Sequence, residues 1–266
     1  MEKKGSVDRV ALRIAELFWY ASHPIISRVL PDQWTRQLVW WRHRYLPRTE
    51  TRGEYTVRQS LRPCDEMGCI FVHIPKAAGN SVTRALFGCG VGHKSIYEYR
   101  EIFGEDFRDY FKFTVVRNPF SRVVSAYEFL KQGGHAAWPN DEHYGDEVLI
   151  KYDGFESFVL EKLSQAVEER KHFRPQWKFL MIGGELAVDY VARLETLQED
   201  FKHVCDRLGV DRKLPHRNKT GADRPPLASY YERDAVADTV RTLYADDFSL
   251  LDYSRQVPRR DRATAE

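Results

Sequence analysis

The chain has 266 residues and a formal net charge of +2, and 42% of its residues are hydrophobic. These values are typical of a globular protein large enough for one sizeable core, and so small a net charge argues against a nucleic-acid partner. The four cysteines form no CxxC pair and there is no HExxH motif, which argues against a metal centre and favours reduced thiols at Cys64, Cys69, Cys89 and Cys205.

Residues 1–66 form a basic segment that is rich in aromatic side chains. Residues 1–60 hold 11 Lys or Arg against 6 Asp or Glu. Apolar residues recur at the spacing of one helical face, at Val10, Ile14, Leu17 and Phe18. We predict an N-terminal helical arm that packs over the following domain. The alternative is peripheral contact with a membrane through residues 1–60.

No apolar stretch is long enough to span a membrane. The nearest candidate, Val10 to Leu30, is interrupted by charged residues and by Pro24. The start MEKKG has no apolar core with a cleavage site, which argues against a signal peptide. These features predict a cytoplasmic location, or a peripheral one at the inner face of the membrane.

The segment Cys69 to Val82, CIFVHIPKAAGNSV, predicts a strand, a tight loop and the start of a helix. Backbone N–H groups at a helix N-terminus favour a phosphate or sulfate group, and Lys76 adds a full positive charge. The segment is not a Walker A loop, because Lys76 comes before Gly79 rather than after the glycines. We therefore predict an anion site over Lys76, Ala77, Ala78, Gly79, Asn80, Ser81 and Val82. An ordinary turn with a solvated lysine is the alternative.

A second strand–helix junction follows at Lys112 to Lys131. Phe113 to Val116 is typical of a buried parallel strand, and Asn118 with Pro119 predicts a helix start. Arg117 then lies at the carboxyl end of the strand, where open α/β sheets bind ligands, and Ser125 lies on the helix that follows. This junction predicts a second anion site. The alternative is that Arg117 pairs with a carboxylate and Ser125 is only a cap.

The rest of the chain is predicted more coarsely. Gly133 to Asp146 is rich in polar residues and helix breakers, which predicts a long loop that is either a wall of the site or a surface segment. Thr196 with Glu199 predicts a capping box, with Gly209 ending the helix. The remaining expected elements are a helix at 155–163, a third strand at 189–194, one or two helices at 232–251 and a disordered tail at 255–266.

The two junctions together carry a resemblance. HIPKAAGNSV followed by FTVVRNPFSRVVSAY resembles the two signature motifs of sulfotransferases that use 3′-phosphoadenosine 5′-phosphosulfate (PAPS). HFRPQWKFL and LPHRNKTG, in that order, are similar to the carbohydrate branch, which includes the heparan and chondroitin enzymes. The resemblance implies a three-layer, P-loop-like α/β fold with a mostly parallel sheet, and a sulfotransferase domain over residues 67–254.

The resemblance also implies roles for single residues. Lys76 to Val82 would bind the 5′-phosphosulfate end of PAPS, with Lys76 on the leaving group, and Arg117 with Ser125 would bind the 3′-phosphate. Asn218 and Lys219 would close over the nucleotide. His93 would be the general base that accepts the proton of the acceptor hydroxyl, without a metal. His172 is the main alternative for the base, and Glu98 and Glu101 are weaker ones.

The implied reaction transfers a sulfuryl group to an acceptor hydroxyl, on a carbohydrate or glycolipid or, as the alternative, on a small-molecule alcohol or phenol. Three other classes stay open: a nucleotide-dependent kinase, a nucleotide-binding protein without transfer activity, and a membrane-surface scaffold. The missing Walker A motif argues against the kinase, and Lys76 with His93 argues against the inactive binding protein. The sequence does not indicate an oligomeric state.

Overall fold

The computed structural model describes residues 41–42, 44–52, 55–135, 138–215 and 225–258. The predictions for residues 1–40, for Asn218 and Lys219, and for the tail from residue 259 onward lie outside these ranges.

A parallel sheet of three strands organises one half of the described structure. It contains β3 (Cys69–Val72), β4 (Phe111–Val116) and β7 (Tyr190–Arg193) in the order β3-β4-β7. All four residues of β3 are buried. A strand that is apolar throughout is expected where helices cover both faces of a sheet. The three strands were predicted from the sequence, and their parallel arrangement confirms the α/β class.

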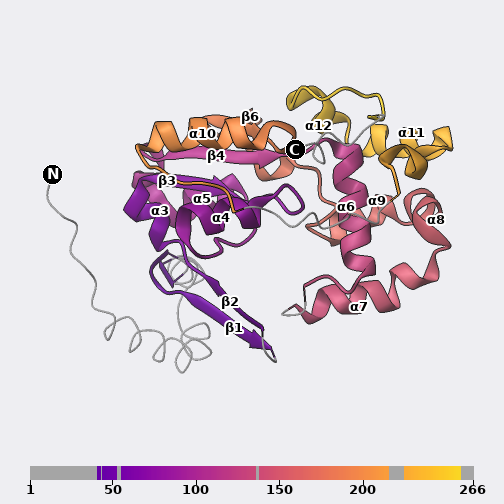
Figure 1. The fold of residues 1–266 in the computed structure, drawn as a ribbon, viewed down its shortest axis with the longest axis horizontal. Helices are drawn as coiled ribbons and strands as arrows, with labels where there is room; N and C mark the ends of the chain where they lie inside the picture. Colours follow the sequence, from indigo (N-terminus) through magenta and orange to yellow (C-terminus); the bar gives the residue numbers. More distant parts are fainter. Residues whose placement is uncertain (1–40, 43, 53–54, 136–137, 216–224, 259–266) are drawn as a thin grey trace, which may run out of the picture.

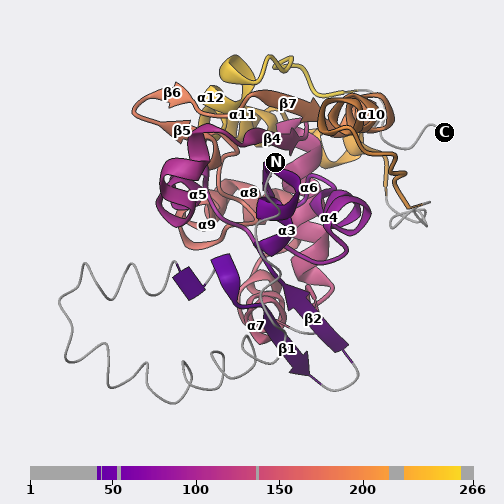
Figure 2. The same ribbon diagram turned by 90° about the vertical axis from the view of Figure 1, so that its left-hand side faces the viewer.

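Helices cover this sheet on both sides, with α10 on one side and α3, α4 and α5 on the other (Figures 1 and 2). Their bounds are α3 (Arg62–Met67), α4 (Gly79–Phe87), α5 (Ile96–Phe103) and α10 (Leu197–Leu208), with a short 3-10 helix η1 (Gly104–Arg108) after α5. A capping box begins α5, because the Ser95 and Glu98 side chains each accept the other residue's backbone N–H. Glu98 therefore stabilises a helix end.

A second, helical half packs around its own buried cluster (Figure 1). Its helices are α6 (Pro119–Lys131), α7 (Pro139–Glu147), α8 (Gly154–Glu161), α9 (Leu163–Glu169), α11 (Asp234–Leu243) and α12 (Ala245–Leu250). The connecting elements are η2 (Leu149–Lys151), η3 (Trp177–Phe179), η4 (Leu194–Thr196), η5 (Leu227–Tyr231) and the strand pair β5 (Met181–Ile182) and β6 (Glu185–Leu186). Aromatic rings such as Phe120, Phe158 and Tyr231 fill the cluster. The helix α6 follows directly from β4 and so joins the two halves.

Two local predictions were wrong. The long loop predicted at 133–146 contains the helix α7, which packs tightly on α6: a β-carbon added at Gly145 would lie 2.3 Å from the Leu130 carbonyl oxygen. A glycine such as Gly145 can thus allow two helices to pack closely, and it need not end a helix. The predicted capping box at Thr196 does not form, because its hydroxyl donates to the Asp200 carboxylate and caps no backbone N–H.

The described end of the N-terminal segment is mostly not helical. Residues 41–42 and 44–45 are helical, but β1 (Arg48–Arg52) and β2 (Tyr55–Gln59) form an antiparallel hairpin that projects from the sheet (Figures 1 and 2). In β1 the sequence alternates threonine with charged residues, and β2 begins with tyrosine, threonine and valine, which favour strands. Arg44 ties this segment to the domain through its ion pairs with Asp65 (2.7 Å) and Asp106. None of the helices in the described ranges is both long and apolar enough to cross a membrane.

Candidate functional site

The loop between β3 and α4 has an unusual backbone. Lys76 (φ 68°) and Ala78 (φ 59°) both adopt the left-handed conformation, which residues with a side chain rarely take. Gly79 begins α4 and lies under the imidazole ring of His73, so closely that an added β-carbon would be 1.8 Å from the ring. Glycine is therefore required at this position by space rather than by its backbone angles.

This curled loop suits an anion. Left-handed residues next to a helix start bring successive N–H groups to one point, and the helix dipole adds to their attraction. Within the predicted set, the amides of Ser81 and Val82 donate to the Ala78 carbonyl oxygen, at 3.0 and 3.4 Å. The amides of residues 77–80 and the Lys76 ammonium are therefore the candidate groups for binding an anion.

The second predicted anion site lies beside the first. Asn118 caps α6 by accepting the Phe120 N–H, as predicted. The Arg117 guanidinium donates to the Ser121 hydroxyl at 2.8 Å and to the Lys76 carbonyl oxygen at 3.5 Å. Ser125 follows one turn after Ser121 on the same helix and is buried. The structure thus brings Arg117 into contact with the loop that carries Lys76, and it stays a prediction that the two junctions share one nucleotide.

Arg122 supports the loop from inside the protein, which the sequence did not reveal. The sequence places Arg122 near Ser121 and Ser125 on one helical face, but its side chain is fully buried. It donates to the carbonyl oxygens of Pro75 (3.1 Å) and Arg174 (2.9 Å). Its Nη1 has no partner among the described residues, and burial lowers the pKa of the guanidinium.

Gln176 and Asp247 hold the carboxyl end of β4 in place. The Gln176 amide accepts the Arg117 backbone N–H (2.9 Å) and donates to the Arg117 carbonyl oxygen (2.8 Å), as a neighbouring strand would do. Asp247 in turn accepts the backbone N–H groups of Gln176 (2.9 Å) and Trp177 (2.8 Å). Burial raises the pKa of the Asp247 carboxyl group.

His93 lies against the loop in one fixed orientation. Its Nδ1 is 2.9 Å from the His73 carbonyl oxygen, and the two imidazole rings are 4.2 Å apart. Because a carbonyl oxygen only accepts, Nδ1 carries the proton and Nε2 has a free lone pair. Burial, together with the charges of Lys171, Lys94 and Lys76, lowers the pKa of His93 to about 4 against the opposing effect of the hydrogen bond to His73, so the ring is neutral at pH 7.

His172, the alternative base, lies in the same site. Burial, together with the positive charge of Lys76, lowers its pKa to about 3. Its Nδ1 is 3.9 Å from a carboxylate oxygen of Asp141, in the unexpected helix α7. Its ring lies 5.4 Å from that of Phe129, and the Lys76 ammonium lies 3.6 Å from the centre of the same Phe129 ring. Both histidines, Lys76 and a buried carboxylate are thus gathered around one loop.

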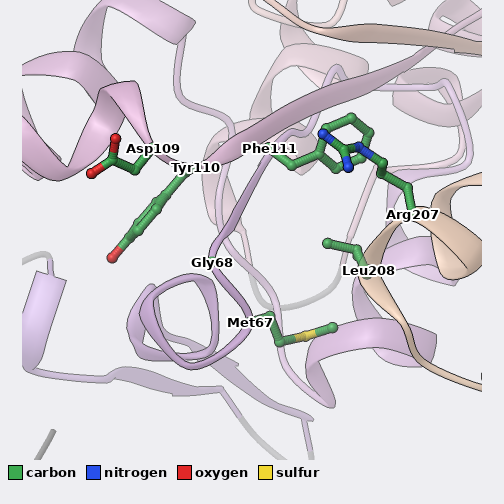
Figure 3. A pocket seen from close by; sticks show the side chains of 7 residues that line it. All are labelled: Met67, Gly68, Asp109, Tyr110, Phe111, Arg207 and Leu208. Atoms are coloured by element: carbon green, nitrogen blue, oxygen red, sulfur yellow. The ribbon is translucent and has the colours of Figure 1, made fainter. Parts of the chain in front are cut away.

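A hollow of about 300 Å³ lies elsewhere, at the end of the sheet where β3 and β4 begin (Figure 3). It is lined by Met67, Gly68, Asp109, Tyr110, Phe111, Arg207 and Leu208. Lys76 and Arg117 follow the opposite, carboxyl ends of the same strands. This hollow is therefore separate from the candidate site.

Two features concern metal binding and cysteine reactivity. Within the described ranges, no three or more His, Cys, Asp or Glu side chains are grouped so that they could hold a metal ion. The four cysteines are free, and Cys64, Cys69 and Cys205 are buried. Burial raises the pKa of these three thiols, which disfavours the reactive thiolate.

Comparison with known protein families gives a match over residues 60–254 to the family described as "Sulfotransferase family". The chain belongs to the sulfotransferase family. The match covers both strand–helix junctions, the two histidines and the segment with Gln176 and Asp247. It confirms the family that the two motifs resemble.

Curated relatives narrow the comparison. Carbohydrate sulfotransferase 11 of Mus musculus is 27% identical over 168 residues, which cover 55% of this sulfotransferase chain and 48% of the relative. Carbohydrate sulfotransferase 12 of Mus musculus is 26% identical over 180 residues, which cover 56% of this chain and 41% of the relative. The chain thus spans about half the length of the curated relatives it matches. No solved structure matches it significantly.

These relatives correct the predicted location. The absence of a spanning segment and of a signal peptide led to the prediction of a cytoplasmic protein, peripheral at most. The relatives are carbohydrate sulfotransferases, a family anchored in the Golgi membrane, so a cytoplasmic location is not supported. The prediction was wrong because the lack of an apolar span in a stretch of chain carries no information about the compartment.

Proposed function

We propose that this chain transfers a sulfuryl group from PAPS to a hydroxyl group of a carbohydrate acceptor. A small-molecule alcohol or phenol is the alternative acceptor. The observation that carries the proposal is the meeting of Lys76 and a neutral, oriented His93 at one curled loop, within a chain of the sulfotransferase family. The names of the curated relatives support a carbohydrate acceptor.

The residues fit the two ends of the donor. A phosphosulfate would lie against the amides of residues 77–80 and the ammonium group of Lys76. Arg117, just before α6, and Ser125, on α6, would hold the 3′-phosphate. Gly79 has no side chain, so its backbone N–H can approach an anion closely.

The reaction itself needs a base and a group that stabilises the leaving oxygen. The acceptor oxygen forms a bond to sulfur while the bond from sulfur to the bridging oxygen of the 5′-phosphate breaks. The electron pair of that bond remains on the bridging oxygen, where Lys76 stabilises the growing negative charge. His93 Nε2 takes the proton of the acceptor hydroxyl. The negative charges of the donor raise the pKa of His93 and so make the bound enzyme's base stronger than the free one.

Calorimetric titration of adenosine 3′,5′-bisphosphate, the donor product, into the protein in EDTA tests the donor site. We expect micromolar binding by the wild type. Lys76→Ala and Arg117→Ala each remove a charge-assisted hydrogen bond to phosphate, so we expect binding to weaken roughly 10- to 100-fold, most for Arg117→Ala. Arg233→Ala, which removes a solvent-exposed cation paired with Glu156, is the control. Binding of ATP with Mg²⁺ in place of the bisphosphate would instead favour a kinase.

A further inference from the structure

The ammonium group of Lys76 rests on an aromatic ring. Its Nζ lies 3.6 Å from the centre of the Phe129 ring, which is van der Waals contact with the ring face. Phe129 is on α6, one turn beyond Ser125, and is only partly buried. The His172 ring packs on Phe129 at 5.4 Å between centroids. One side chain therefore contacts both the lysine expected to meet the leaving group and a candidate base.

The backbone favours this arrangement. Lys76 is held at φ 68°, and its carbonyl oxygen accepts from Arg117 while Arg122 holds the preceding carbonyl of Pro75. With the loop fixed in this way, the lysine side chain extends toward α6 and Phe129. An ammonium group is attracted to the face of an aromatic ring, but less strongly than to a phosphate oxygen. The ring can therefore hold the lysine until a phosphate is present.

We propose that Phe129 is a positioning residue: its ring holds Lys76 in the donor-free protein and releases it when the phosphosulfate end of the donor binds. This inference rests on the proposed function. Breaking the contact with the ring opposes donor binding, since the lysine exchanges one partner for another. The same contact keeps the Lys76 ammonium group ordered beside the site before the donor binds.

A double-mutant cycle measures this exchange with adenosine 3′,5′-bisphosphate as the probe. Phe129→Leu keeps apolar volume but removes the ring, so we expect the bisphosphate to bind about two- to tenfold more tightly. In the Lys76→Ala background the same substitution should change the affinity by less than about twofold, because no lysine remains to be held. Equal effects in both backgrounds, or weaker binding in Phe129→Leu, would overturn the proposal.

Two further variants separate the ring from general packing. Phe129→Trp keeps an aromatic face and should restore wild-type affinity. Phe107→Leu is the matched control. Phe107 lies in η1, away from the site, and is also partly buried, and the Lys112 ammonium lies 5.3 Å from the centre of its ring. We expect it to leave the affinity unchanged. Melting temperatures of all variants would identify any that fail to fold.

NMR of the ¹³C-methylated lysines tests the contact without a nucleotide. Ring current should shift the Lys76 methyl resonance upfield in the wild type but not in Phe129→Leu, with Lys76→Arg giving the assignment. Adding the bisphosphate should remove this shift. No upfield resonance in the free protein would contradict the resting position. If the Lys76 methyl resonance is shifted upfield but the protein binds no bisphosphate, the contact with Phe129 exists and the proposed function is wrong. The proposed release of Lys76 on donor binding would then be wrong as well.

Discussion

His73 supports two parts of the site at once. Its ring covers Gly79 and packs 4.2 Å from the His93 ring, and its carbonyl oxygen accepts a hydrogen bond from His93 Nδ1–H. Burial holds its pKa well below the ordinary value, so the ring is neutral. An imidazole this enclosed shapes the loop and fixes the tautomer of its neighbour, which is a positioning role.

Gly79→Ala tests the contact between Gly79 and His73. The added β-carbon would meet the imidazole at 1.8 Å, so either the ring or the start of α4 must move. We expect a loss of about 2 kcal/mol in the free energy of unfolding and roughly tenfold weaker binding of adenosine 3′,5′-bisphosphate. Urea denaturation and calorimetry measure the two effects.

A second substitution shows whether the cause is steric. His73→Ala in the Gly79→Ala protein removes the clashing ring, so this pair should recover part of the lost stability. Gly104→Ala is the control. An added β-carbon there meets nothing within 4 Å, so the change in the free energy of unfolding reports only the cost of a positive φ of 57°. If Gly79→Ala were no worse than Gly104→Ala, the steric explanation would fail.

Among the elements, α6 holds the loop in place. Arg122 in its first turn donates to the Pro75 carbonyl oxygen, and Arg117, two residues before the helix, donates to that of Lys76. Two consecutive loop carbonyls are thus held from the start of a single helix, next to the strained backbone at Lys76 and Ala78. Strained conformations persist only where neighbouring groups hold them, and here those groups lie at the start of α6.

Arg122→Met should therefore destabilise the protein. It leaves the carbonyl oxygens of Pro75 and Arg174 without their donors and removes the positive charge near the buried carboxylate of Asp247. We expect a loss of about 3 kcal/mol in the free energy of unfolding, measured by urea denaturation. Arg84→Met, an exposed arginine on α4, should change it by less than about 0.5 kcal/mol. A similar small change in Arg122→Met would contradict the supporting role.

The sequence predicts those elements whose signals are local. The strands β3, β4 and β7, the Asn118 cap and the glycine at the end of α10 all depend on neighbouring residues, and each was predicted. The contacts of Arg122 with Pro75 and of Gln176 with Asp247 join residues 47 and 71 positions apart. Such pairs leave no spacing to recognise. For the same reason, the sequence treated His93 and His172 as alternatives, whereas the fold brings them together.

At the scale of the whole molecule, the site lies between two hydrophobic clusters. The loop after β3 belongs to the cluster around the sheet, and α6 belongs to the helical cluster. Polar groups on this boundary lose water when the halves pack together. The consequence is a set of neutral, buried histidines, His73, His93 and His172, whose pKa values all lie below the ordinary value.

These histidines make the stability of the whole protein depend on pH. A histidine whose pKa is lowered by folding contributes its full stability above the unfolded pKa, near 6.5, and that stability is lost as the pH falls toward the folded pKa. With folded values of about 4 for His93 and about 3 for His172, the loss spans the range from pH 6.5 to pH 4 and below. From pH 7.5 to pH 5.5 we expect the free energy of unfolding to fall by about 1 kcal/mol for each such histidine.

Urea denaturation at these two pH values, in wild type and His172→Gln, tests the assignment of this pH dependence to the buried histidines. The substitution removes one titrating group, so it should reduce the pH-dependent loss by about 1 kcal/mol even if it lowers stability at both pH values. The carboxyl group of Asp141, whose pKa burial raises, acts in the opposite sense but is present in both proteins, so its contribution largely cancels. His143→Gln, at an exposed imidazole on α7, is the matched control for the substitution itself. An equal loss in wild type and His172→Gln would mean that the charged form of His172 is tolerated in the folded protein, and the boundary between the clusters would then have to be open to water.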